Sequence, residues 1–366
     1  MFVLTNGALQ RAGDPPRFRW RWLATKARIH DLAGELGEAV RGFETALALA
    51  STELGEHHAH LANLLHGYSR ALLRHGDARE ALAVAQRAQA IAEARYGPRH
   101  PQVSAHLTSI GNAKAGLGQY DGAIAAFERA IKLSQDALGP DHPRLGALHN
   151  NLGIAYMQTR GPELALPHFE RAVIIDRASL GEHHPHPVPA MYGSAMVYFS
   201  RGEYDTAEPI LREGLEIVRR AWGPEHPDQA YLTTALADLE IERGHPQQGL
   251  QGHRRVLALL EPAFGKQHPR LVPTLMGIAR ALSQLDRPED AIVALEKAVI
   301  IVDRGRNQPV EAAETRFVLA QALRTAGRDA SRVTALARGA HTVIASAGPG
   351  YTARAEALAT WLDERD

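Results

Sequence analysis

Residues 139–143 read Gly-Pro-Asp-His-Pro, and this short stretch recurs along the chain at a constant interval. Close copies stand at 97–101 (GPRHP), 181–185 (GEHHP), 223–227 (GPEHP) and 265–269 (GKQHP). The first glycines, at 55, 97, 139, 181, 223 and 265, are each 42 residues apart, and a weakened copy begins 40 residues later at Gly305. A register kept over so many copies indicates a tandem repeat.

A second series of glycines lies about midway between these loops, at Gly34, Gly76, Gly118, Gly161, Gly202 and Gly244. The loop glycine is suited to the left-handed conformation that ends a helix. The proline after the loop histidine is suited to the first turn of the next helix. Each repeat is therefore predicted to be a helix, a tight turn, a second helix and a loop.

Apolar residues recur at helical spacing within each repeat. Between Arg144 and Gly181, one face of the first helix carries Leu148, Leu152, Ala155 and Tyr156, and the second helix carries Ala165, Phe169, Ala172 and Val173. A small residue recurs on the second helix at Ala39, Ala81, Ala123, Ala207 and Ala291, with Gly249 in the remaining copy. A small side chain at that position lets two helices approach closely.

These residues resemble the tetratricopeptide repeat, whose pattern is Leu-Gly-x-x-Tyr on the first helix and a spaced Ala, Phe, Ala on the second. Leu152-Gly153-Ile154-Ala155-Tyr156 with Ala165, Phe169 and Ala172 match it best, followed by Ile110-Gly111 with Ala123, Phe127 and Ala130. The period of 42 residues and the His-Pro loop are similar to the kinesin-light-chain subgroup. The resemblance implies an all-α fold, a right-handed α-solenoid of helix-turn-helix repeats.

About eight repeats are expected over residues 15–347, after an N-terminal extension over residues 1–14. Residues 348–366 are expected to form a C-terminal capping helix, with Ala355, Leu358 and Leu362 on the face toward the last repeat. The repeat around 233–256 departs most, because Gly249 and His253 replace the usual Ala and Phe, and it is expected to be looser.

The composition excludes several classes of protein. Lys+Arg and Asp+Glu are 41 each, so there is no basic excess of the kind that supports nucleic-acid binding. Zero cysteines exclude disulfides and thiolate metal sites. We found neither a membrane-spanning apolar stretch nor a signal peptide, which favours a cytoplasmic protein. Because only 5 of the 41 basic residues are Lys and Ala is abundant, a bacterial source is favoured.

The sequence offers no catalytic motif, and we expect no catalytic residue, no metal and no cofactor. Phosphate-binding loops, dinucleotide fingerprints, His-Glu-x-x-His and nucleophile elbows are all absent. The histidine clusters around His57 and His183 could be read as metal ligands. Since a histidine appears in all six full copies of the loop, its capping and packing are the preferred interpretation.

The resemblance further implies that the first helix of each repeat lines a concave groove, which is the candidate peptide-binding site. The residues predicted to face it are Asn63, His66, Arg70, Arg74, Thr108, Asn112, Asn150, Asn151, Tyr192, Met196, Phe199 and Tyr231. Asn amides can satisfy the backbone of an extended peptide, and arginines can pair with carboxylates. Tyr192, Met196, Phe199 and Tyr231 together would form an apolar pocket for one large side chain of the ligand. The expected ligand is an acidic peptide with an aromatic or leucine anchor; the alternative is that these are ordinary solvated helix faces.

Three functional hypotheses remain open. The first is a non-catalytic scaffold that binds a protein or peptide partner in the groove, without nucleic acid or membrane. The second is the regulatory or sensor array of a larger signalling enzyme, such as a kinase or protease, whose effector domain is absent from this chain. The third is a self-assembling structural protein.

Overall fold

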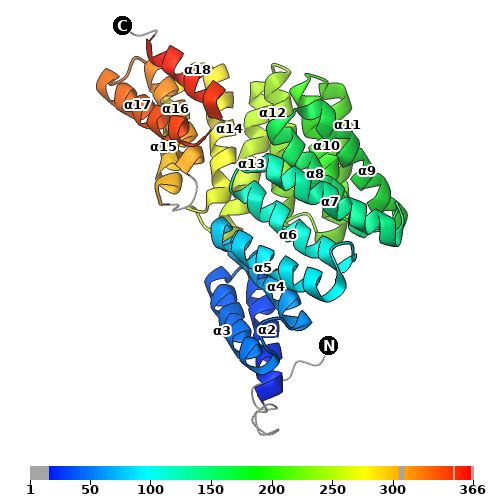
Figure 1. Cartoon of the computed structure of the whole chain (residues 1–366). Helices are drawn as coiled ribbons and strands as arrows, with labels where there is room; N and C mark the ends of the chain where they lie inside the picture. The colour runs from blue at the N-terminus through cyan, green and yellow to red at the C-terminus, as the bar shows by residue number, and fades with distance from the viewer. Residues whose placement is uncertain (1–15, 305–308, 349–350, 364–366) are drawn as a thin grey trace. The chain divides into compact units, whose positions relative to one another are not determined.

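The computed structural model describes residues 16–304, 309–348 and 351–363. These residues form 17 α-helices and no strand, as expected for an all-α repeat fold (Figure 1). The chain divides into two compact units, unit 1 as far as Gly181 and unit 2 from Glu182 onward. Each unit is a series of helical pairs joined by short turns.

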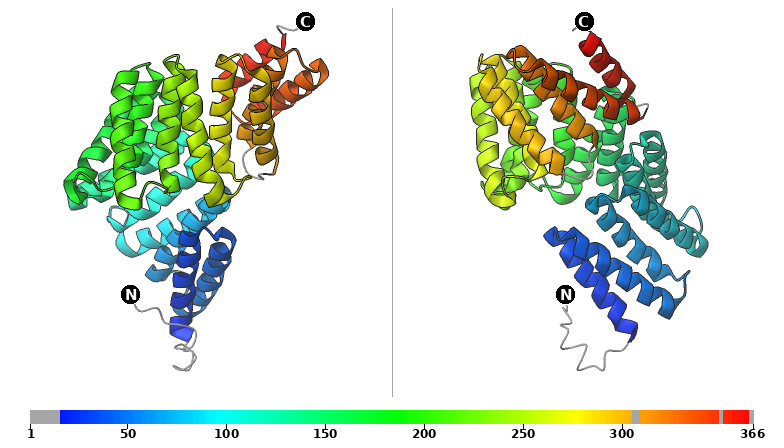
Figure 2. Two further views of the ribbon diagram at one scale, coloured as in Figure 1. Left: turned by 180° about the vertical axis from the view of Figure 1, so that it is seen from behind. Right: turned by 90° about the vertical axis from the view of Figure 1, so that its left-hand side faces the viewer.

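Unit 1 holds four pairs: α2 (Pro16–Ala33) with α3 (Leu36–Leu54), α4 (Ala59–His75) with α5 (Ala78–Tyr96), α6 (Gln102–Gly116) with α7 (Tyr120–Leu138), and α8 (Arg144–Thr159) with α9 (Pro162–Leu180). Unit 2 holds another four: α10 (Val188–Ser200) with α11 (Tyr204–Trp222), α12 (Ala230–Glu242) with α13 (Pro246–Phe264), α14 (Val272–Gln284) with α15 (Pro288–Arg304), and α16 (Pro309–Thr325) with α17 (Ala330–Ser346). A final helix, α18, spans Thr352–Asp363. In Figure 2 the helices of residues 188–264, green to yellow, stand side by side.

The loop histidines cap the helices that follow them. In all six full copies of the loop, the histidine Nδ1 accepts the backbone N–H two residues later at 3.1–3.2 Å, in the N-cap manner usually seen for Ser, Asn and Asp (His58, His100, His142, His184, His226 and His268). His226 and His268 begin short 3-10 turns whose first residue is the following proline. Capping explains why the histidine recurs with the period of the repeat.

The loop glycines have positive φ but not the left-handed helical conformation that was expected. Gly139, for example, has φ 89° and ψ 163°, and the other five full copies lie close to it. This region of backbone space is open almost only to glycine. The chain therefore leaves each second helix in an extended direction, which carries it to the next cap.

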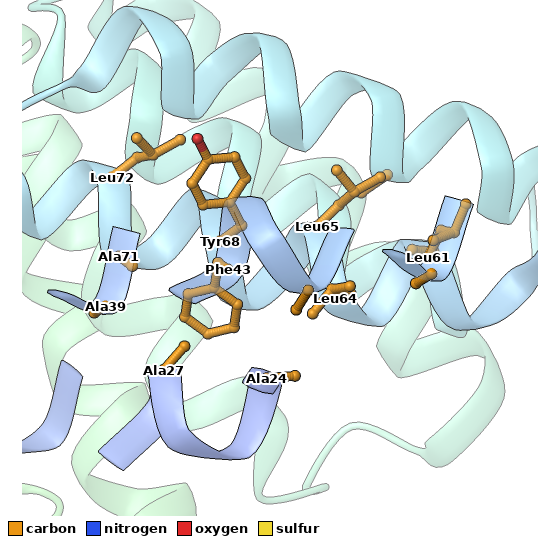
Figure 3. Packing of buried hydrophobic residues seen from close by; sticks show 14 of the residues in the cluster. Ala24, Ala27, Ala39, Phe43, Leu61, Leu64, Leu65, Tyr68, Ala71 and Leu72 are labelled. Atoms are coloured by element: carbon orange, nitrogen blue, oxygen red, sulfur yellow. The ribbon is translucent and has the colours of Figure 1, made fainter. Parts of the chain in front are cut away.

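In several repeats the core is built where an aromatic ring lies against a glycine of a neighbouring helix. Phe127 and Phe169 are buried, and a Cβ added at Gly111 or Gly153 would lie 2.4 and 2.7 Å from their rings. In Figure 3 the ring of Phe43 lies between Ala27 of α2 and Tyr68 of α4. The recurring alanines Ala39, Ala81, Ala123, Ala165, Ala207 and Ala291 are all fully buried. The repeating glycines and alanines thus set how closely the helices pack.

The divergent repeat, α12 with α13, is closely packed on one side and open on the other. A Cβ at Gly249 would lie 2.7 Å from the carbonyl oxygen of Ala237, so α13 approaches α12 more closely than alanine would allow. His253 is 0% exposed and its ring covers Gly277, in the manner of the phenylalanines elsewhere. A cavity of about 850 Å³ opens where α11, α12 and α13 meet. The looser packing expected of this repeat as a whole stays a prediction.

The final helix packs on the last pair through the expected face. Ala355 and Leu358 of α18 are buried with Ala313 and Ile344, and Leu362 packs at the edge of the same cluster. Trp361 meets Phe317 edge-on at 5.1 Å, and the Arg324 guanidinium stands 3.6 Å above the Trp361 ring. The function of α18 as a cap stays a prediction, and the extension over residues 1–14 lies outside the described residues.

Candidate functional site

Within each unit, first helices of successive pairs pack against one another. We call this row of first helices the inner layer of the unit. In unit 1, α4 packs against α2 and α6, and α6 packs against α8; in unit 2, α12 packs against α10 and α14. Among the described residues, successive second helices make no comparable contact. The predicted groove residues all lie on these first helices, so they share the inner layer of their own unit.

Three asparagine amides join α6 to α8 in unit 1. The Nδ2 of Asn151 donates to the Oδ1 of Asn112 at 3.1 Å, and the Nδ2 of Asn150 points to the Oδ1 of Asn151 at 3.5 Å. The Oδ1 of Asn150 is buried and accepts no hydrogen bond from the described residues. Because each amide offers both donors and an acceptor, this group has hydrogen-bonding capacity that its own contacts do not use.

Arg70 and Arg74 are held by an acidic residue that sequence reasoning missed. The Nη2 of Arg70 lies 2.8 Å from the Oδ2 of Asp31, and the Nη1 of Arg74 lies 2.6 Å from its Oδ1. Asp31 is 1% exposed, whereas the two arginine side chains are 50% and 44% exposed. Each guanidinium carries five N–H donors, so both keep donors that face solvent.

The remaining predicted residues of unit 1 are less closely grouped. The ring Nδ1 of His66 lies 2.7 Å from the hydroxyl of Ser109, and burial, reinforced by the Arg70 charge, lowers the pKa of His66. The Thr108 hydroxyl donates to the Ser104 carbonyl of its own helix at 2.9 Å. Asn63 is exposed on α4. Thr108 therefore has its donor satisfied within α6, and His66 is tied to the next helix.

Charge is unevenly distributed between the layers of unit 1. Its four first helices, α2, α4, α6 and α8, contain nine Lys and Arg residues and a single acidic residue, the buried Asp31. In unit 2 the four first helices, α10, α12, α14 and α16, contain five acidic residues and three arginines. The net charge of zero thus conceals a basic inner layer in unit 1 and an acidic one in unit 2.

The four aromatic and methionine residues predicted for unit 2 do not form one pocket. Tyr192 of α10 and Tyr231 of α12 meet edge-on at 5.0 Å and line a cavity of about 390 Å³ with Pro227, Leu260 and Pro273. Burial raises the pKa of Tyr231 to about 12. Phe199 packs against Tyr204 of its own pair at 5.4 Å, and neither Phe199 nor Met196 lines this cavity.

The inner layer contains a second cavity. It measures about 640 Å³ and is lined by α12, α14, α15 and α16, including Asp238, Arg280, Val318 and Gln321. It shares Pro273 with the tyrosine cavity, so the two adjoin. The α16 residues were missed because the loop before them is the degraded copy at Gly305, where the repeat register is lost.

No metal centre or membrane-spanning helix is found in the part of the chain that the structure describes. Within those residues, no three His, Asp or Glu side chains come together as metal ligands would. Within the same residues, every helix is too short or too polar to cross a bilayer.

This chain matches one protein-family model and is similar to several solved structures. A family model described as tetratricopeptide repeat matches residues 22–94, 71–136, 102–178, 146–220 and 187–251. The crystal structure of the apo form of RapI aligns with 79% of this chain and 98% of its own length, at 16% identity and a TM-score of 0.58. A comparison with curated protein sequences finds no match.

Two further solved structures are similar. BtubC (BKLC) from P. vanneervenii aligns with 64% of this chain and 92% of its own length, at 18% identity and a TM-score of 0.52. A Podosopora anserina putative kinesin light chain with nearly identical TPR-like repeats aligns with 57% of this chain and 98% of its own, at 24% identity and a TM-score of 0.47. At such identities the likenesses to RapI and BtubC show the fold alone.

Proposed function

Because the chain belongs to the tetratricopeptide repeat family, we propose that it is a non-catalytic, cytoplasmic scaffold whose inner layer binds an extended segment of a partner protein. Repeats of this family generally mediate protein–protein interaction, and no catalytic family is indicated. The observation that carries the proposal is the amide group of Asn112, Asn151 and Asn150, whose Asn150 Oδ1 is left without a partner.

An extended peptide brings unpaired backbone donors and acceptors, which amide side chains satisfy without reading the peptide sequence. The basic inner layer of unit 1 favours an acidic segment there, and the solvent-facing donors of Arg70 and Arg74 would pair with its carboxylates. The cavity between Tyr192 and Tyr231 in unit 2 would take a large apolar side chain.

The repeat itself supplies a matched variant for the test. Asn150 and Asn151 occupy the positions that Thr234 and Ala235 occupy two repeats later, so Asn150→Thr/Asn151→Ala installs side chains that this fold already accommodates. We would select random dodecapeptides displayed on phage with the full chain, and measure binding of the enriched peptides to both proteins. The variant is expected to bind at least about tenfold more weakly, because two hydrogen bonds of about 1 kcal/mol each are lost.

The control is Gln86→Ala, which removes an exposed amide from the second helix α5, outside the inner layer, and is expected to keep most of the affinity. Far-UV circular dichroism of all three proteins checks that helical content is unchanged. Equal binding by the wild type and the Asn150/Asn151 variant would show that the amide group is not part of the peptide-binding site. A failure to enrich any peptide would contradict the proposed function as a whole.

A further inference from the structure

The inner layer of unit 2 contains two adjoining cavities with different linings. The first, of about 390 Å³, has the crossed rings of Tyr192 and Tyr231 on one side and Leu260 and Pro273 on the other. The second, of about 640 Å³, begins at Pro273 and continues over Met276 and Gly277 to α16. A ligand segment lying across α12 and α14 would therefore pass from a cavity lined by two aromatic rings to one lined by none.

Asp238 lines the second cavity, and Glu242 shares an arginine with it. Arg280 is the one basic residue on α10, α12 and α14, and it is shared by two carboxylates: it contacts Asp238, and its Nη1 lies 3.3 Å from the Oε1 of Glu242. The buried His253 also reaches Asp238, with its Nε2 3.1 Å from Oδ1. Glu242, 35% exposed, has Arg280 as its only ion-pair partner among the described residues. One cation shared by two carboxylates leaves an excess of negative charge.

That charge lies beside the aromatic cavity. Asp238 lines the second cavity, which shares Pro273 with the cavity of Tyr192 and Tyr231. At the opposite rim, Asp228 is paired with Arg270 at 3.5 Å and is neutralised. The unbalanced charge is thus confined to the side of Asp238 and Glu242.

We propose that unit 2 binds a segment in which a large apolar side chain is accompanied by a nearby Lys or Arg. The apolar side chain enters the cavity between Tyr192 and Tyr231, and the cation lies against Asp238 and Glu242 and completes the pairing that Arg280 leaves unfinished. Charge complementarity identifies this partner. A bound segment with an acidic residue beside its apolar side chain would place that negative charge next to the carboxylates of Asp238 and Glu242. The inference rests on the proposed function and assigns unit 2 a preference opposite in sign to that of unit 1.

The experiment uses the full chain and random dodecapeptides displayed on phage, selected in parallel on the wild type, Tyr231→Ala and Glu242→Gln. Tyr231 has alanine at the equivalent positions Ala105 and Ala147, and Glu242→Gln keeps the size of the side chain at a partly exposed site, so both variants are expected to fold. Asp238→Asn/Glu242→Gln removes the charge completely. Glu240→Gln is the matched control, since Glu240 is on the same helix but lines the outer cavity beside α11.

The expected result is a class of peptides with Lys or Arg within a few residues of Trp, Tyr, Phe or Leu. These peptides should bind Tyr231→Ala and Asp238→Asn/Glu242→Gln about tenfold more weakly, Glu242→Gln several-fold more weakly, and Glu240→Gln as tightly as the wild type. Enrichment of acidic peptides alone, sensitive only to the Asn150/Asn151 change, would overturn this inference and leave the proposed function standing. No enrichment would overturn both.

Discussion

Asp31 shows how unequal the two sides of an ion pair can be. Its carboxylate is 1% exposed, whereas Arg70 and Arg74 are about half exposed. Water can therefore solvate the guanidiniums if the carboxylate is removed, but it cannot reach the carboxylate if the guanidiniums are removed. The pair that sequence analysis assigned to a ligand is thus also structural, and it ties the first repeat to the second.

We expect Arg70→Ala/Arg74→Ala to destabilise the protein by about 3 kcal/mol or more, because it leaves a buried, unpaired charge. Asp31→Asn should cost about 1–2 kcal/mol, because only hydrogen bonds to charged donors are weakened. Urea unfolding followed by circular dichroism measures both. Equal losses, or a larger loss for Asp31→Asn, would show that the exposure of the partners does not set the cost.

Buried histidines in unit 1 predict a loss of stability in mild acid. Burial lowers the pKa of His106 and of His149 to about 4, assisted by His66 in the first case and by His168 and Arg171 in the second. In the unfolded chain the pKa of histidine is about 6.5. As pH falls the unfolded chain takes up protons first, so stability present above about pH 6.5 is lost progressively toward pH 4.

The loss is on the order of 3 kcal/mol for each histidine at the acid end of that range. His106→Leu/His149→Leu tests it, because leucine occupies the equivalent positions at Leu64 and Leu107. Free energies of unfolding measured from pH 7.5 to 4 should fall less steeply for the double variant. A slope identical to that of the wild type would exclude these two residues as its origin.

At the scale of a helix, the loop histidine replaces the usual capping residues. His142 accepts the N–H of Arg144 at 3.2 Å at the start of α8. His142→Ala should cost about 1 kcal/mol, the usual value of an N-cap, and His142→Asn should recover most of it because asparagine is a strong N-cap. Chemical unfolding compares the two. Equal destabilisation by alanine and asparagine would mean that packing of the ring, and not capping, explains the repeated histidine.

At the scale of the whole molecule, a repeat array is held together by contacts between neighbouring elements. Because the chain divides after Gly181, residues 1–181 and residues 182–366 are each expected to be helical and to unfold cooperatively when produced separately. A fragment ending at residue 160 is the control. It lacks α9 and uncovers Gly153 and Leu152, against which Phe169 and its neighbours pack, so it should be less helical or aggregate. Similar helicity per residue in both N-terminal fragments would contradict the division.

The sequence alone determined the repeat, its eight helical pairs and the helical segment at its C-terminus, because each of these depends on local signals. A capping side chain accepts a hydrogen bond from a backbone N–H two residues later, and the spacing of an apolar face is set within one helix. A small residue allows the neighbouring helix to pack closely. The tertiary structure decided how the inner side chains are used. Asp31 meets arginines 39 and 43 residues away, Asn151 meets Asn112, and Phe199 turns toward Tyr204. Such pairings depend on how one helix is rotated against the next and on which rotamer each side chain adopts, and neither is encoded in the period of the repeat.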